Sequence, residues 1–148
     1  MSTNENCTFA HVYNVGVQKI KANQSVEFSN NGKLKGVTHQ IKGTQIKVCD
    51  AGSYFVSYEL YFSKNVTDKL LSFGITVNGE LQQQSQVFIQ TAPINLKLNS
   101  FCTHSFIVDL PSNSVITLFN TSGVDTLLAS TGYQSPYSNA SLTLYKIC

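Results

Sequence analysis

The chain has 148 residues, of which 42% are hydrophobic and 12% charged, and its formal net charge is +2. This length suits one domain that can bury about two thirds of its extended surface. The low net charge and the scattered lysines exclude an electrostatic case for nucleic-acid binding, and no run approaches the roughly 20 apolar residues of a membrane-spanning helix.

The chain begins with a polar stretch, Met1 to Asn6, which predicts no secretory signal peptide. Residues 1–8 are expected to form a short arm, and residues 9–147 a single domain. Runs of strand-forming residues alternate with turn residues, and no amphipathic helical pattern stands out. Turns are expected at Asn30-Asn31-Gly32 and at Lys42-Gly43. The strands expected in this part are Cys7–Val15, Val17–Lys21, Asn23–Phe28, Leu34–Gln40 and Thr44–Cys49.

The segment from Asp50 to Ser63 is the centre of the predicted fold. An Asp and a Gly open it as a turn, and about ten residues rich in Tyr, Phe and Val follow. Alternation along a strand separates two faces. The apolar row that must face the core is Tyr54, Val56, Tyr58, Leu60 and Phe62. The opposite face is mixed but keeps two rings, and its residues are Phe55, Ser57, Glu59, Tyr61 and Ser63. Two aromatic rings on that face of a long central strand indicate a second buried side, such as another subunit.

After this segment the pattern of short strands continues to the end of the chain. Asn78-Gly79 is the strongest short hairpin signal, and Pro111-Ser112-Asn113 is a second turn. Segments expected to be loops or an edge piece are Lys64–Lys69, Thr91–Leu98 and Gly132–Ser138. The expected strands are Leu71–Val77, Glu80–Gln90, Phe101–Leu110, Ser114–Thr121, Thr126–Ser130 and Asn139–Ile147. About ten short strands with turns between them predict an all-β sandwich or barrel.

No catalytic, cofactor or metal site is predicted. The histidines His11, His39 and His104 have no partners at metal-ligand spacing, and no nucleophile–base set can be recognised. No pair of carboxylates suggests general acid–base work. The four cysteines are far apart in the sequence and form no CxxC pair, which argues against zinc. The sequence therefore predicts a protein that is not an enzyme.

Three groups of residues, in this order along the chain, carry a resemblance to a known family. The first is Val26-Glu27-Phe28 with Gly36-Val37-Thr38-His39, the second is residues 52–60 with Val77-Asn78-Gly79, and the third is residues 108–115 with residues 139–145. Together they resemble the C1q and tumour-necrosis-factor-like jelly roll. The high Asn, Ser and Thr content and the low charge resemble its bacterial branch. That branch includes the heads of collagen-like filaments and basal-layer proteins of spores, although no Gly-X-Y repeat precedes the domain here.

The resemblance implies a jelly-roll β-sandwich that forms a homotrimer through the outer face of the sheet holding the central strand. It places four residues in the interface: Phe55, Tyr61, Ile107 and Tyr145. The implied function is a non-enzymatic structural or assembly protein of a bacterial spore surface, in the exosporium or an appendage, with other spore-surface or filament proteins as further partners. The alternative is a receptor- or glycan-binding adhesive tip of a filament or phage fibre, with recognition by the loops at Lys64–Lys69 and Gly132–Ser138.

The resemblance also bears on the cysteines. In a jelly roll the first and last strands pair antiparallel, so Cys7 and Cys148 are expected to lie close together. They would either form a bond that closes almost the whole chain, which stabilises by roughly 3–5 kcal/mol, or link neighbouring subunits. Cys49 and Cys102 are expected to be reduced and buried.

Overall fold

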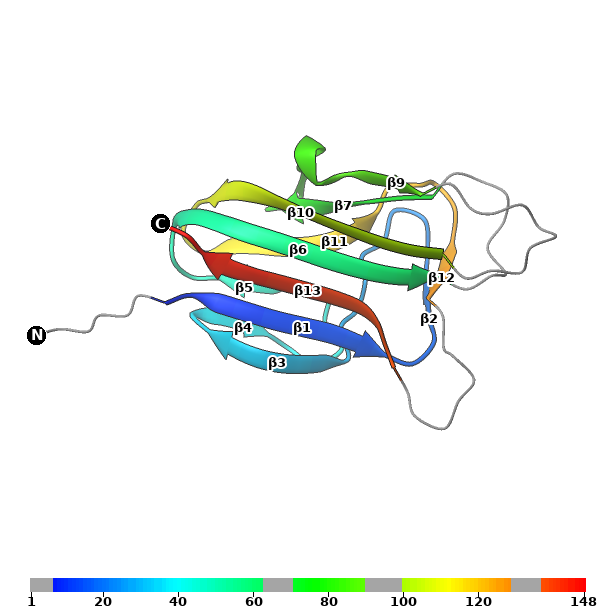
Figure 1. Ribbon diagram of the computed structural model, residues 1–148, viewed down its shortest axis with the longest axis horizontal. Helices are drawn as coiled ribbons and strands as arrows, with labels where there is room; N and C mark the ends of the chain where they lie inside the picture. The colour runs from blue at the N-terminus through cyan, green and yellow to red at the C-terminus, as the bar shows by residue number, and fades with distance from the viewer. Residues whose placement is uncertain (1–6, 63–70, 90–99, 129–136) are drawn as a thin grey trace, which may run out of the picture.

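The computed structural model describes residues 7–62, 71–89, 100–128 and 137–148. Within them the chain forms two antiparallel sheets that face each other (Figure 1). The larger sheet contains β2 (Gln18–Ile20), β12 (Thr126–Leu128), β6 (Gly52–Phe62), β13 (Ser138–Lys146), β1 (Phe9–Val15) and β3 (Asn30–Lys35), and β10 (Ser100–Leu110) pairs with β6. The smaller sheet contains β4 (Val37–His39), β5 (Ile46–Val48), β11 (Ser114–Asn120), β7 (Leu71–Val77) and β8 (Glu80–Leu81), and β9 (Val87–Ile89) pairs with β7.

The core lies between the two sheets, and β6 supplies its centre. The five residues predicted to face inward from this strand are all fully buried, which confirms the alternation. Two of them are tyrosines, and each hydroxyl finds a partner, as buried phenols require. Tyr54 donates to the backbone oxygen of Asp50 at 2.8 Å, and Tyr58 donates to that of Ser85 at 2.5 Å. The contact of Tyr58 joins the centre of the larger sheet to the 3₁₀ turn η1 (Gln83–Ser85) beside the smaller one.

The first and last strands pair as expected, and two hairpin turns are confirmed. In the ladder of β1 with β13, Phe9 lies opposite Tyr145 and Val12 opposite Leu142. Asn78 and Gly79 both have positive φ angles and connect β7 to β8, which is the backbone of a tight hairpin turn. Lys42 also has a positive φ, of 70°, in the connection between β4 and β5.

Three predicted element boundaries are wrong. The expected turn at residues 30–32 lies inside β3, because Asn30 and Asn31 pair with β1. The expected strand Leu34–Gln40 is two strands, since Gly36 adopts a φ of +68° that breaks it between β3 and β4. The expected strand Asn23–Phe28 is irregular, with a bridge from Ser25 to Phe119 as its one assigned pairing in the described chain.

Another predicted strand, Glu80–Gln90, is replaced by β8, η1 and β9. This segment folds back over β7, and the hydroxyl of Ser85 holds it there, accepting from the backbone N of Ile75 at 2.7 Å. Every residue of β7 is buried as a result. The segments Lys64–Lys69 and Thr91–Leu98, and residues 132–136 of the expected loop at Gly132–Ser138, lie outside the described residues, and Ser138 begins β13.

Candidate functional site

The outer face of the larger sheet carries an apolar row that runs across four strands. Strand register sets Phe9 opposite Tyr145, Tyr145 opposite Phe55, and Phe55 opposite Ile107. The rings of Phe55 and Tyr145 stack with their centroids 5.2 Å apart. Ile107 is 61% exposed and Tyr145 is 47% exposed. The row is therefore a continuous strip of large hydrophobic side chains, of which Ile107 and Tyr145 are exposed and Phe9 and Phe55 are half-buried in one copy of the chain.

A second apolar cluster lies toward the other end of the same strands. Tyr61 of β6 lies opposite Phe101 of β10, and Phe101 is 58% exposed. Both side chains line a shallow hollow of about 30 Å³, together with Glu59, Leu60 and residues 138–141. Tyr137, just before β13, is also exposed. This end of the face therefore has aromatic side chains that lie outside the core and are exposed to solvent.

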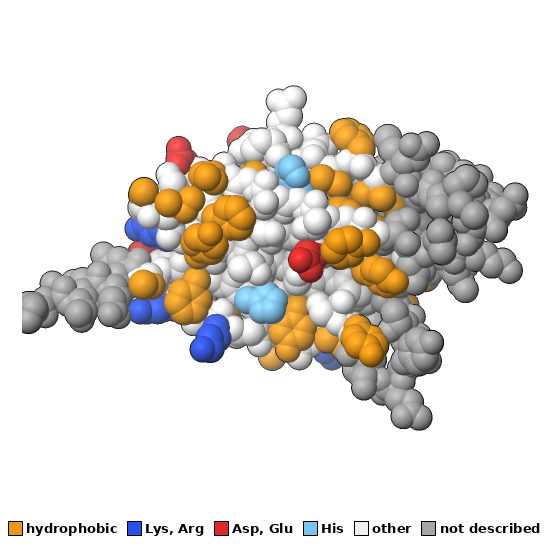
Figure 2. Space-filling model, viewed as in Figure 1, with side chains coloured by type: hydrophobic (Ala, Val, Ile, Leu, Met, Phe, Trp, Pro, Cys, Tyr) orange, Lys and Arg blue, Asp and Glu red, His pale blue; other side chains and the backbone are white. Residues whose placement is uncertain are grey.

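A polar belt separates the two apolar clusters. Figure 2 shows hydrophobic side chains gathered toward both ends of this face, with mostly polar surface, an acidic group and two histidines between them. The register explains the belt, because two successive outward-facing rows across β1, β13, β6 and β10 contain small or polar side chains and one tyrosine. The first row is His11, Thr143, Ser57 and Ser105, and the second is Tyr13, Ser141, Glu59 and Thr103.

The structure brings three of the four predicted interface residues together. Phe55, Ile107 and Tyr145 share the apolar row, whereas Tyr61 belongs to the second cluster. The prediction missed Phe9 and Phe101. Phe101 lies six residues from Ile107 on the same strand, so strand alternation alone places both on one face. That signal was present in the sequence.

Each of the three histidines contacts other residues of the fold through hydrogen bonds or ring stacking. His39 is buried, its Nε2–H donates to the backbone oxygen of Gly43 at 2.9 Å, and its Nδ1 contacts the side chain of Asn31. Nε2 of His104 lies 2.9 Å from the backbone oxygen of Gln84. His11 is exposed and stacks on Tyr13. Across the residues described here, no group of three or more His, Cys, Asp or Glu side chains is arranged to hold a metal ion.

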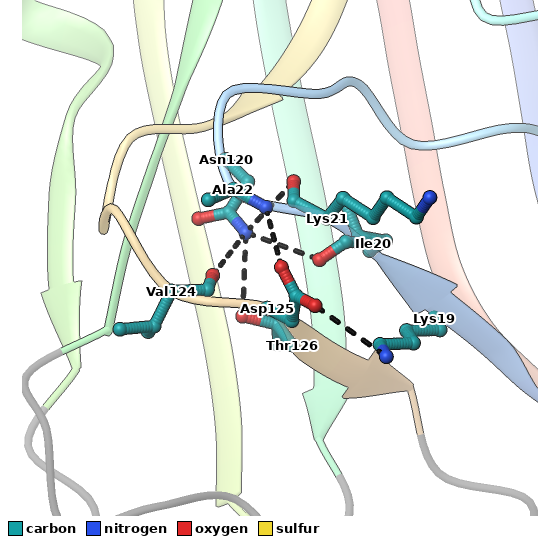
Figure 3. A network of polar contacts seen from close by, with 8 residues as sticks. All are labelled: Lys19, Ile20, Lys21, Ala22, Asn120, Val124, Asp125 and Thr126. Carbon is teal, nitrogen blue, oxygen red and sulfur yellow. Dashed lines mark hydrogen bonds and ion pairs between the residues drawn. The ribbon is translucent and has the colours of Figure 1, made fainter.

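A network of polar contacts joins the end of β2, and the two residues that follow it, to β11 and β12 (Figure 3). The buried side chain of Asn120 donates to the backbone oxygen of Val124 at 2.8 Å. Asp125 accepts from the backbone N of Ala22 at 3.0 Å and pairs with Lys19 at 3.4 Å. The hydrogen bond from Ala22 lowers the pKa of the Asp125 carboxyl, and the nearby Lys19 lowers it further. These groups satisfy one another, so the network holds β2 in place.

The cysteines depart from expectation. All four are free, so the structure contains no Cys7–Cys148 bond. Cys102 is buried as predicted, but the prediction that Cys49 is buried is wrong, because its side chain is exposed. Cys49 directly follows β5, in which Ile46 and Val48 are buried and Lys47 is exposed, so the same alternation places Cys49 on the exposed side.

Solved structures define the class of protein to which this fold belongs. Eiger TNF from S. frugiperda is 14% identical with a TM-score of 0.75, and the match covers 97% of this chain and 94% of that one. Murine APRIL at pH 8.5 is 16% identical with a TM-score of 0.65, covering 96% and 100%. The globular domain of zebrafish complement 1qA is 11% identical with a TM-score of 0.64, covering 95% and 98%. The fold is a TNF- and C1q-like jelly roll, as predicted.

The family is defined by sequence. The model of the BclA C-terminal domain matches residues 10–148, nearly the whole chain. The chain therefore belongs to the family of BclA C-terminal domains, which are C-terminal domains of exosporium collagen-like proteins. A search of the curated proteins found no match. The part of the chain that the structure describes contains no helix long and apolar enough to cross a membrane.

Proposed function

We propose that this chain is a non-enzymatic assembly module of the bacterial spore surface, and that it forms a homotrimer through the outer face of the larger sheet. The apolar row of Phe9, Tyr145, Phe55 and Ile107 carries the proposal. Single hydrophobic side chains are common on protein surfaces, but a contiguous exposed strip marks an interaction site. This strip lies on the central strands, where a flat face can be covered by another copy.

The rest of the face has the composition of an interface. Interfaces combine hydrophobic anchors with hydrogen-bonding groups, and aromatic residues are enriched in them. Here aromatic clusters at the two ends flank the belt of hydroxyl-bearing side chains, and Glu59 and His11 are exposed within it. In a closed ring of three copies each contact is heterologous. Each copy would therefore use this face and a second surface at the same time.

Membership of the BclA C-terminal domain family supports a place in the exosporium. The family match and the TNF- and C1q-like fold support a structural role over catalysis. The mechanism of such a module is burial of its own apolar surface against its copies, which fixes where the chain lies in a layer. No bond needs to be made or broken.

The oligomeric state tests the proposal directly. Sedimentation equilibrium of the purified protein at micromolar concentration, in the presence of reductant, is expected to give three times the 16.3 kDa mass of one chain. Reductant keeps any disulfide linkage from contributing to this mass. A stable monomer over that concentration range would refute the trimer. The location needs a separate test, in which antibodies raised against the chain are expected to label the outermost layer of intact spores.

A further inference from the structure

Three of the four cysteines lie at one end of the sandwich. Cys7 precedes β1, Cys49 follows β5, and Cys148 ends the chain. The residue after Cys7 and the residue after Cys49 are in contact, because the hydroxyl of Thr8 donates to the carboxylate of Asp50 at 3.1 Å. In Figure 1 the start of β1, the end of β5 and the C-terminus all lie at the same end of the molecule.

The C-terminus is fixed at this end by backbone contacts. The backbone N of Ser53 donates to the oxygen of Cys148 at 3.1 Å, and the backbone N of Lys146 donates to that of Thr8 at 2.9 Å. Gly52 permits this approach, since a side chain there would place its first carbon 2.4 Å from the oxygen of Cys148. The position of Cys148 therefore follows from the ladder of hydrogen bonds, and Cys49 is held in the same way, because its backbone N donates to the oxygen of Gly36 and its oxygen accepts from the backbone N of Asn113, both at 3.1 Å.

The three thiols at this end differ in environment from the fourth. Cys7, Cys49 and Cys148 are exposed. Cys102 is only 7% exposed, and burial raises the pKa of its thiol to about 11. A thiol reacts as its thiolate and only where a reagent can approach it. The end of the sandwich thus collects the accessible thiols, while the thiol inside the sandwich is protected.

The register disfavours a bond between Cys7 and Cys148 in one chain. Phe9 lies opposite Tyr145, and continuing this ladder by two residues sets Cys7 opposite Ile147, not opposite Cys148. A shift of one residue turns a side chain to the other face of a sheet. The four cysteines are free, and none lies at disulfide distance from another.

We propose that the end formed by Cys7, Cys49 and Cys148 is a covalent docking surface, which joins one copy of the chain to the same end of another copy through disulfide bonds. A second copy is the matching partner because it presents the same three thiols. The end also carries charges of both signs, Asp50, Asp109 and Lys146, so the lysine of one copy can face a carboxylate of the other. This linkage does not depend on the trimer, because it uses the end of the sandwich and not the face of the sheet.

The chemistry is thiol–disulfide exchange with a small disulfide as the oxidant. A cysteine thiolate of one copy attacks the small disulfide, forms a mixed disulfide and releases one small thiol. A thiolate of the second copy then attacks the protein sulfur of the mixed disulfide and releases the second small thiol. Two protein thiols are oxidised to one bond between chains, and one small disulfide is reduced to two thiols.

The test is to incubate the purified full chain with oxidised glutathione and analyse it on a denaturing gel without reductant. Wild-type protein is expected to give bands of two or more chains that collapse to one chain on reduction. The triple variant Cys7→Ser/Cys49→Ser/Cys148→Ser is expected to remain a single chain. The matched control Cys102→Ser, which keeps the three exposed thiols, is expected to cross-link like wild type.

Peptide mapping of the cross-linked bands completes the test, and it is expected to find pairs drawn from residues 7, 49 and 148. The proposal is overturned if the triple variant still cross-links, or if bonds use Cys102. It is also overturned if the wild-type protein stays a single chain. A single chain that has lost two hydrogens through an internal disulfide counts as this outcome. Because the gel is denaturing, these results do not depend on whether the non-covalent trimer exists.

Discussion

Replacing Ile107 with Glu tests the proposed trimer face at the side chain that one copy exposes most within the apolar row. Ile107 is 61% exposed, so a single copy should fold without the isoleucine. Burying a whole isoleucine stabilises by about 1.5–3 kcal/mol, so burying the exposed part is worth about 1–2 kcal/mol per subunit. For three subunits this is about 3–6 kcal/mol, before any cost of burying a carboxylate. The association constant of the trimer should fall at least about 100-fold.

Phe88→Glu is the matched control for this variant. Phe88 is 66% exposed, but it lies on β9 of the smaller sheet and not in the apolar row on the outer face of the larger one. Sedimentation equilibrium over the micromolar range should show a loss of trimer for Ile107→Glu and an unchanged trimer for Phe88→Glu. Circular dichroism melts of both variants should confirm folded subunits. If the two variants assemble equally well, or lose assembly to the same extent, the face has been assigned wrongly.

Three further predictions concern the folded subunit. Tyr58→Phe should cost about 1–2 kcal/mol in urea unfolding, through the lost hydrogen bond to Ser85, whereas Tyr58→Ala should cost about 3–5 kcal/mol; an unchanged stability for Tyr58→Phe would show that the hydroxyl contributes nothing. Asn120→Ala should cost about 1–3 kcal/mol because it removes the closer donor to the part-buried oxygen of Val124 and leaves only the Ser122 hydroxyl at 3.5 Å, and a loss below about 0.5 kcal/mol would contradict that role. Burial raises the pKa of Cys102 from 9.0 to about 11, so between these values the folded chain retains a proton that the unfolded chain releases. Stability should therefore be complete below about pH 9 and fall as pH rises toward 11, by up to about 1.4 kcal/mol per pH unit, and urea titrations should show a shallower fall for Cys102→Ala.

The sequence predicted the inner face of β6 because that signal is local and repeated. Five alternate residues from Tyr54 to Phe62 are large and apolar, and a strand can bury them on only one side. The Asn78-Gly79 turn was equally readable, since few residue types tolerate positive φ at both positions. Features that follow from the preferences of neighbouring residues can be recognised in a single sequence.

Features that depend on contacts between distant segments could not be recognised. Asn30 and Asn31 read as a turn, yet pairing with β1 holds them in a strand. The segment after Gly79 reads as one strand, but the hydroxyl of Ser85 anchors it across β7 as a 3₁₀ turn. In both cases a partner outside the segment outweighs the local preference, and no pattern within the segment identifies that partner.

The candidate site combines the two kinds of information. Alternation assigns Phe55 and Ile107 each to the outside of its own strand, but only register shows that they lie opposite each other and next to Tyr145. A shift of the β6–β10 pairing by two residues would keep every side chain on its face and yet place Phe55 in the row of a polar neighbour. The apolar row, and the polar belt beside it, are therefore properties of the sheet and not of any strand. If copies of the chain pack on this face, the same rows limit how they can slide past one another, because moving an apolar row onto the belt would bury hydroxyls and Glu59 against hydrocarbon.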